Sequence, residues 1–408
     1  MIILCEPQCK GYSHEQFNAG FLYGYSLSYP EEQILFFGEK NHNRCIRSIL
    51  DSSSLEQINV EFHDIEIPEG NSLVIMIKYL KVIDTLLNFA KTNKCQKISF
   101  LSIYSFNLLP LKLLLHHKYN HSFLVHIMMH GTLEFVKRKN YSFFRKFLNL
   151  LKKIIAHFNK ISQSLVDEGS QNIYFYEKLF KKALHVFGNK HISYYVFRED
   201  SLKKVHQYLP SIASYFRWID LPYIYKNDKP RFSEQMDFDG LFLTFDKGNT
   251  SELNELFEAL FANKDNSKLN PIQIIGKNTN MEDYCHPQML NLYHMGELSR
   301  KQIEEMMTKA KYLLILYPET SYELTTSGLL FDGVAYCKPM IFLKNVCLDY
   351  YYNNYKFGYR CENLEEISKI IQKIILGEGK EYPFFCSEIF RMQSDVSIKQ
   401  SFLKLRFE

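Results

Sequence analysis

The chain has 408 residues, 46% of them hydrophobic, and its 49 lysines and arginines against 45 acidic residues leave a net charge of +4. That length exceeds one ordinary hydrophobic core and fits two domains of roughly 200 residues each. The small net charge, together with the lack of a base-reading module, argues against nucleic acid as a partner.

The first half of the chain alternates apolar runs of strand length with helical patterns. Residues 2–5 predict a strand at the very start, and residues 14–27 predict the helix that follows it. Further strands are predicted, in chain order, at 33–37, 72–77, 97–101, 123–129 and 192–197. Helical stretches between these strands imply a parallel sheet with crossover connections.

Two places in this half are candidates for a site. Gly11 and Tyr12 lie in the polar loop after the first strand, and His130 directly follows the strand 123–129. Ligands of open α/β sheets bind beyond the carboxyl ends of the strands, which is where both places would lie. A histidine there could equally serve only to cap its strand, and a glycine could serve only an ordinary turn.

Residues 137–160 carry many lysines and arginines and no acidic residue, while phenylalanine, leucine and isoleucine recur at helical spacing. This pattern predicts a basic amphipathic helix, of the kind that is attracted to an anionic membrane surface. The alternative is a helix that packs its apolar face on its own domain and exposes its lysines to water.

Nine cysteines are scattered along the chain without the Cys-x-x-Cys spacing of a metal site. Glu6 interrupts the first apolar residues, which argues against a secretory signal. The longest uncharged stretch in the first half, 98–111, is too short to cross a bilayer. We therefore expect reduced cysteines and a cytoplasmic protein, which the basic stretch could bring to the face of a membrane.

The second half also alternates strands and helices, with its clearest unit near residue 320. Strands are predicted at 241–245, 272–276, 312–316 and 340–343, and helices at 297–310 and 328–336. Thr325, Thr326 and Ser327 are helix-capping residue types and precede Gly328, so they predict where the second helix begins. The free N–H groups and positive dipole end of such a helix suit a phosphate.

This half resembles the donor-binding domain of GT-B glycosyltransferases, which use nucleotide sugars. The resemblance rests on the helix that carries Asp332 and ends before Pro339, on Gly276 after its strand, and on Lys247 with Gly248 after the first strand. Asp332 stands where the family usually has glutamate, and the arginine that the family places shortly before the lysine is missing. A second family glutamate corresponds to Leu324, although Glu323 is adjacent and Glu319 lies slightly earlier.

The resemblance implies an α/β protein of the GT-B type, with two Rossmann-like domains that face each other across a cleft. We expect an acceptor-side domain at 1–225, a donor domain at 231–380 and a helical tail at 381–408 that returns to the first domain. Such an enzyme would transfer a sugar from a nucleotide-sugar donor to a glycan, lipid-linked or protein acceptor. It would need neither a metal ion nor another cofactor.

The resemblance also implies a role for each candidate residue. Donor binding is expected of Lys247, Gly248, Thr325, Thr326, Ser327, Gly328 and Asp332, catalytic contacts of His130, Glu319 and Glu323, and the acceptor-side loop of Gly11 and Tyr12. Among these, Lys247 and the helix N–H groups would stabilise the leaving phosphate. Lys247 could also be an ordinary solvated turn lysine.

Two other functions remain open on the sequence alone. His286-Pro287 is similar to a His-Pro pair of sialyl-type transferases, which use CMP-linked donors in a GT-B fold. The missing arginine and Leu324 would also fit a partner or chaperone protein of this fold that has lost catalysis.

Overall fold

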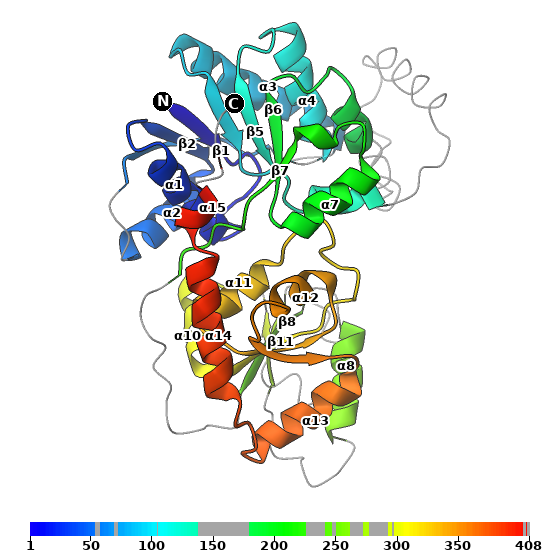
Figure 1. Cartoon of the computed structure of the whole chain (residues 1–408). Helices are drawn as coiled ribbons and strands as arrows, with labels where there is room; N and C mark the ends of the chain where they lie inside the picture. Colours follow the sequence, from blue (N-terminus) through cyan, green and yellow to red (C-terminus); the bar gives the residue numbers. More distant parts are fainter. Residues whose placement is uncertain are drawn as a thin grey trace.

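The computed structural model describes residues 1–53, 58–68, 72–103, 105–137, 179–225, 241–246, 250–261, 272–276, 293–295, 298–402 and 405. Their strands form two separate sheets, one in each half of the chain (Figure 1). Every strand pairing in these described parts is parallel. The predicted α/β fold with two parallel-sheet halves is confirmed.

The N-terminal sheet has seven strands in the order β3-β2-β1-β4-β5-β6-β7. The strands are β1 (Ile2–Cys5), β2 (Ile34–Gly38), β3 (Val60–Asp64), β4 (Lys97–Phe100), β5 (Leu124–Met128), β6 (Ile192–Val196) and β7 (Phe216–Trp218). The helices are α1 (Glu15–Ser28), α2 (Lys40–Ser52), α3 (Ser72–Thr92), α4 (Ser105–His117) and α7 (Glu199–Tyr208), with short 3-10 helices η1 (Thr132–Lys137) and η2 (Ala213–Tyr215). Strand β1 lies between β2 and β4, so the chain adds β2 and β3 on one side of β1 and then β4 to β7 on the other side. Such a switch point forms a crevice at the carboxyl ends of the strands.

The C-terminal sheet has six strands in the order β10-β9-β8-β11-β12-β13. The strands are β8 (Phe242–Asp246), β9 (Ile272–Gly276), β10 (Tyr293–Met295), β11 (Tyr312–Ile315), β12 (Met340–Leu343) and β13 (Gly358–Cys361). The helices are α8 (Thr250–Phe261), α10 (Arg300–Lys309), α11 (Gly328–Ala335), α12 (Val346–Tyr352), α13 (Leu364–Ile375), α14 (Tyr382–Asp395) and α15 (Ile398–Phe402).

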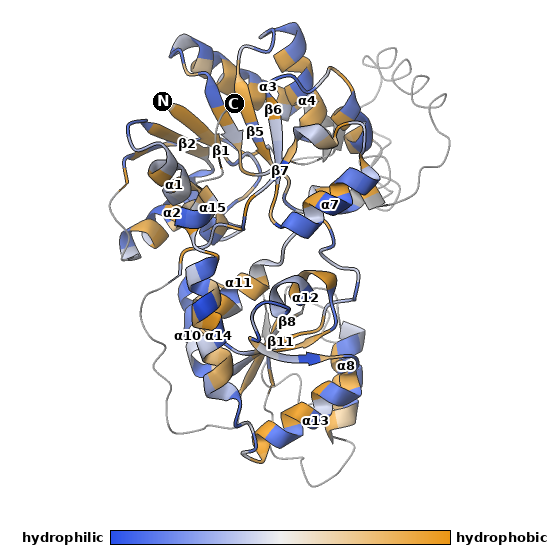
Figure 2. Ribbon diagram, in the orientation of Figure 1, coloured by the Kyte–Doolittle hydropathy of each residue, from blue (hydrophilic) through white to orange (hydrophobic). Residues whose placement is uncertain are grey.

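Strands β1 and β11, which lie inside the two sheets, consist of apolar residues along their whole length. All four residues of β1 are buried, and so are all four of β11. Continuous apolar runs of this kind are typical of parallel sheets. The helices differ from these strands: α7 and α13 carry both hydrophobic and hydrophilic residues (Figure 2).

One predicted strand is wrong. Residues 72–77 form the first turns of α3, which continues for 21 residues. The run Leu73–Ile77 is as short and apolar as a strand, but the buried residues that follow it, Ile83, Leu86, Leu87 and Ala90, recur at helical spacing. The strand in this part of the chain is the more polar β3, which lies at the edge of the sheet.

The end of the chain returns to the N-terminal half. Helix α14 runs beside α11, and α15 then packs on α1 (Figure 1). A Cβ atom on Gly24 would lie 2.4 Å from the ring of Phe402, so the glycine lets the two helices meet closely. The hydroxyl of Ser28 donates to the carbonyl of Phe402 at 2.9 Å, which fixes the last helix on the first.

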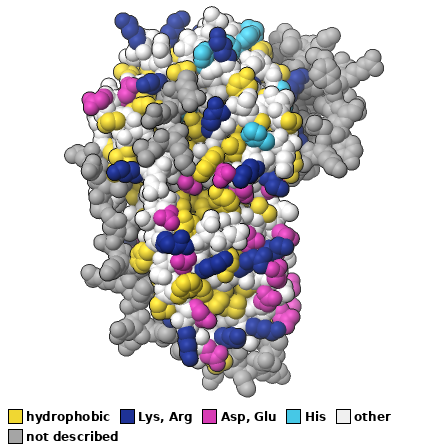
Figure 3. Space-filling view, in the orientation of Figure 1, with side chains coloured by type: hydrophobic (Ala, Val, Ile, Leu, Met, Phe, Trp, Pro, Cys, Tyr) yellow, Lys and Arg dark blue, Asp and Glu magenta, His cyan; other side chains and the backbone are white. Residues whose placement is uncertain are grey.

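The face drawn in Figure 3 mixes both signs of charge over the C-terminal half, where lysines and arginines lie among aspartates and glutamates. In the described part of the chain, no helix combines the length and the apolar character that a membrane span requires.

Candidate active site

The carboxyl ends of the two sheets meet around the loop that follows β11. His130 and Glu134 follow β5, Arg198 follows β6, and the side chains of Glu134 and Arg198 hydrogen-bond to residues 322–325 of the other half. The edge at which open α/β sheets bind ligands is therefore shared by both halves.

His130 is half-buried at the end of β5 and faces the loop after β1. Its ring centroid lies 4.2 Å from that of His14, at an interplanar angle of 76°, and 4.9 Å from that of Phe17. His14 is the N-cap residue of α1 and has a left-handed backbone with φ of 59°. Sequence reasoning selected His130 but missed His14, because only the fold brings these two histidines together.

A buried carboxylate fixes the start of the loop after β1. Glu6 is fully buried and accepts hydrogen bonds from the N–H groups of Gln8 and Cys9, at 3.0 and 3.2 Å, and from Nδ2 of Asn18 at 3.2 Å. The hydroxyl of Ser102 donates to the same carboxylate. The loop thus leaves β1 in a shape that these bonds determine.

The tip of this loop is held by α2. Gly11 has φ of +51°, its carbonyl lies 2.8 Å from Nδ1 of His42, and its N–H donates to Glu39 at 3.4 Å. Tyr12, the next residue, has 43% of its surface exposed. The predicted acceptor-side loop is therefore anchored at Gly11 and presents an aromatic ring to solvent.

Among the described residues, Glu6, Cys9 and His14 bring their possible metal-ligand atoms within 4.8 Å of one another. Sγ of Cys9 lies 3.3 Å from Nδ1 of His14. Burial, and then the charge of Glu6, raise the pKa of the Cys9 thiol far above its usual range, which disfavours the thiolate that binds metals. Since the Glu6 carboxylate already accepts hydrogen bonds from the loop, these three residues are better explained as a loop anchor.

Helix α11 begins where the capping residues predicted. Ser327 is its N-cap, and the Ser327 hydroxyl accepts from the N–H of Leu330 at 3.4 Å. Thr325, Thr326 and Ser327 are at most 3% exposed, whereas Gly328 is partly exposed and a Cβ atom there would meet nothing within 4 Å. A ligand at this helix end would thus meet the backbone at Gly328 rather than the buried hydroxyls before it.

Asp332 lies in a polar cluster between the two halves. Its Oδ1 accepts from the hydroxyl of Tyr223 and from Nη1 of Arg300 at 3.2 Å, and Arg300 also lies 3.6 Å from Glu15 on α1. Burial raises the pKa of Glu15 to about 7, although the guanidinium of Arg300 favours the charged form. Sequence reasoning found Asp332 but not Arg300, Tyr223 or Glu15, whose patterns look like ordinary helix and linker residues.

The two other predicted carboxylates lie apart from this cluster. Glu319 is 60% exposed and pairs with Lys344 at 2.9 Å. Glu323 is 13% exposed and faces α7, where its Oε1 lies 3.3 Å from both Lys204 and the hydroxyl of Tyr208. Leu324, between Glu323 and the helix cap, is fully buried.

Several predicted residues lie outside the described part of the chain. They are Lys247 and Gly248, the pair at 286–287, and residues 138–160 of the basic stretch.

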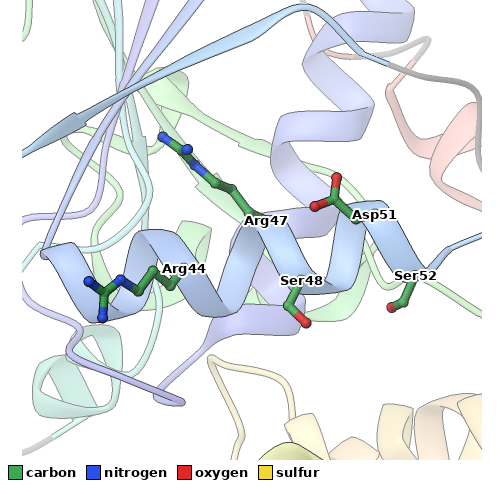
Figure 4. A pocket seen from close by; sticks show the side chains of 5 residues that line it. All are labelled: Arg44, Arg47, Ser48, Asp51 and Ser52. Carbon is green, nitrogen blue, oxygen red and sulfur yellow. The ribbon is translucent and has the colours of Figure 1, made fainter.

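A surface hollow lies elsewhere, on α2. It is lined by Arg44, Arg47, Ser48, Asp51 and Ser52, all from this one helix (Figure 4). None of the predicted site residues lines it.

No family model matches this sequence, and no curated protein is similar to it. Solved structures do share its fold. Sucrose-phosphate synthase from Thermosynechococcus elongatus superposes with a TM-score of 0.62 and 10% identity, over 99% of this chain and 96% of that one. The glycosyltransferase WaaG, involved in lipopolysaccharide biosynthesis, superposes with a TM-score of 0.59 and 10% identity, over 99% and 98%.

A third structure, Phytolacca americana UGT2 in complex with UDP-2fluoro-glucose and pterostilbene, superposes with a TM-score of 0.50 and 11% identity, over 98% of both chains. At these identities the likeness concerns the fold, and it covers nearly the whole of each chain. The chain therefore has the GT-B fold, with two parallel-sheet halves whose carboxyl edges meet.

Proposed function

We propose that this protein is a glycosyltransferase that moves a sugar from a nucleotide-sugar donor to an acceptor bound on the N-terminal half. The observation that carries the proposal is the GT-B fold over 99% of the chain, with the carboxyl edges of both sheets meeting at the loop before α11. Fold alone does not determine function, so the site must carry the argument further.

The donor phosphates are proposed to lie at the N-terminus of α11. The first N–H groups of a helix have no partner within the helix, and the dipole adds positive potential there. The space beside Gly328 would let a diphosphate approach the backbone. Fixed N–H groups would then stabilise the charge that develops on the leaving nucleoside diphosphate, which is the role that a metal ion has in other transferases.

Asp332 is proposed to accept hydrogen bonds from the ribose. One of its oxygens already accepts from Tyr223 and Arg300, so ribose would use the second oxygen or replace Tyr223. Lys247 is proposed to contact the phosphates, and Glu319 or Glu323 to contact the sugar. For Glu323 this would require release of Lys204 and Tyr208.

His130 is proposed to contact the transferred sugar from the acceptor side. It lies beside His14 at the base of the loop that presents Tyr12. The acceptor itself is proposed to be a glycan, a lipid-linked sugar or a protein. A cytoplasmic location, with attraction of the stretch 137–160 to anionic lipid, remains part of this proposal.

A thermal-shift screen tests the proposal. Wild-type protein is heated with UDP, GDP, CMP and their sugar conjugates, beginning with UDP-glucose because one structure of this fold holds a UDP-glucose analogue. A ligand that binds only the folded state raises the midpoint by mass action, by an amount that grows with its concentration. A rise with CMP conjugates alone would favour the sialyl-type alternative, and no rise with any nucleotide would favour the inactive-partner alternative.

A further inference from the structure

A fully buried arginine of the N-terminal half binds the backbone of the C-terminal half. Nη1 and Nη2 of Arg198, which follows β6, donate to the carbonyls of Tyr322 and Glu323, each at 2.9 Å, and Nη1 also donates to the carbonyl of Thr325. Asp200 accepts from Nε at 2.8 Å and from Nη2 at 3.2 Å. The planar fork of a guanidinium can make all of these bonds together, which an ammonium group cannot.

Glu134 binds the same loop as a hydrogen-bond acceptor, whereas Arg198 binds it as a donor. Its Oε1 accepts from the N–H of Leu324 at 2.7 Å and from the hydroxyl of Thr325 at 3.1 Å. Side chains of the other half thus bind three carbonyls of residues 322–325, and also the N–H of Leu324 and the hydroxyl of Thr325. Buried backbone groups need such partners, because losing a bond to water without replacement is costly.

The backbone of this loop has an unusual conformation that requires support. Tyr322 has φ of 61°, in the left-handed region that large side chains rarely adopt. Such a conformation persists where the surrounding contacts fix it, and these positions cluster at ligand-binding and switch regions. Two residues after Thr325, Ser327 caps α11, so the shape of this loop determines where the N-terminus of the helix lies.

We infer that Arg198 and Glu134 are positioning residues, which hold residues 322–325 in the shape that places the N-terminus of α11 for a nucleotide phosphate. The inference rests on the proposed function for the identity of the ligand. Neither residue touches the donor in this arrangement. Both instead hold, from the N-terminal half, a loop of the C-terminal half. Separation of the two halves would therefore release residues 322–325 and weaken nucleotide binding.

The experiment compares Glu134→Ala with Glu134→Gln in the full chain. The amide oxygen of glutamine can accept the same two hydrogen bonds, whereas alanine leaves the N–H of Leu324 without its partner. Arg198→Lys is made in parallel, and Arg360→Lys is the matched control, because Arg360 pairs with Asp349 at 2.8 Å within the C-terminal half only. Hydrogen–deuterium exchange of residues 320–330 is measured without nucleotide, and UDP affinity is measured by calorimetry.

Glu134→Ala and Arg198→Lys should speed exchange in 320–330 and weaken UDP binding roughly ten-fold, as expected for lost charge-assisted hydrogen bonds. Glu134→Gln should keep most of the wild-type protection from exchange and most of the UDP affinity. Arg360→Lys should change neither of these two quantities.

The inference would be overturned if Glu134→Ala kept the exchange rate and the UDP affinity of the wild type. It would also be overturned if Glu134→Ala and Glu134→Gln lost equal amounts of protection and affinity. If the wild type binds no nucleotide, the proposed function fails, and exchange in 320–330 then decides alone whether these two residues position the loop. If Arg198→Lys does not fold, the two Glu134 variants decide.

Discussion

At the residue scale, His130 and Asp332 lie at different parts of the junction between the halves. His130 belongs to an aromatic group with His14 and Phe17 in the N-terminal half, whereas Asp332 belongs to a charged group with Arg300 in the C-terminal half. A substitution of each residue should therefore affect a different kinetic quantity.

His130→Ala should lower turnover by about 100-fold, the typical contribution of a positioned catalytic side chain, and leave UDP affinity nearly unchanged. The proposed contact of His130 is with the reacting sugar and not with the nucleotide. Single-turnover kinetics and calorimetry measure the two quantities separately. His116→Ala, which replaces an exposed histidine on α4, is the control. Full turnover in the His130 variant would leave this histidine with a structural role only.

Asp332→Asn should weaken UDP binding by about 1.5–3 kcal/mol, because the ribose would lose a charged acceptor. Asparagine keeps the size of the side chain and can still accept a hydrogen bond from Tyr223, which protects the packing of α11. Calorimetry with UDP gives the affinity, and the thermal midpoint confirms that the variant is folded. Asp395→Asn, an exposed change on α14, is the control. Wild-type affinity in the folded Asp332 variant would remove Asp332 from the site.

At the element scale, the position of α15 on α1 depends on a glycine, Gly24, which has no side chain to separate the two helices. The backbone of α1 can approach Phe402 closely only because residue 24 is a glycine. The tail that includes α14 also packs beside α11, so it connects the first helix of the chain with the helix proposed to bind the donor.

Gly24→Ala should destabilise the protein by about 1–3 kcal/mol, the usual cost of an overpacked contact. The added methyl group would lie 2.4 Å from the Phe402 ring, so that ring and α15 must shift. Denaturant unfolding followed by tryptophan fluorescence and circular dichroism measures the loss. The double variant Gly24→Ala with Phe402→Ala should lose less than the sum of the two single changes, because the clash is absent. Simple additivity of the two losses would show that Gly24 and Phe402 do not constrain each other.

At the scale of the whole molecule, the contact between Glu15 and Arg300 joins the two halves at a buried, titratable position. The pKa of Glu15 is raised from 4.5 to about 7, first because of burial. The folded state therefore keeps a proton on Glu15 that the unfolded chain releases near pH 4.5.

The contribution of Glu15 to stability is fully present below pH 4.5 and is lost as the pH rises through about 7. The whole change amounts to about 3 kcal/mol. Glu15→Gln removes the titration and keeps the size of the side chain. We expect the stability of this variant, relative to the wild type, to increase between pH 5 and pH 8, as measured by thermal midpoints in matched buffers. A constant difference over that range would mean that Glu15 titrates normally.

The sequence by itself determined the local elements. Apolar runs such as 2–5 and 312–316 predicted buried strands, and the capping residues before Gly328 predicted the start of α11. Both signals can be recognised because the residues that produce them are neighbours along the chain. The run 72–77 was misread because a short apolar segment fits a strand and a helix equally. Strands β3, β7, β10 and β13 were not predicted, since each mixes polar residues into three to five positions and so lacks an apolar run.

Only the tertiary structure decided which residues of the two halves meet. Arg198 and Tyr322 are 124 residues apart, and nothing in the sequence near either one indicates the other. Glu323 looked like a candidate for sugar contact, yet its carboxylate faces α7 because the halves dock at this loop. The pattern of a helix or strand encodes which of its own faces is buried, whereas the partner of a loop side chain depends on how two separately formed sheets pack together.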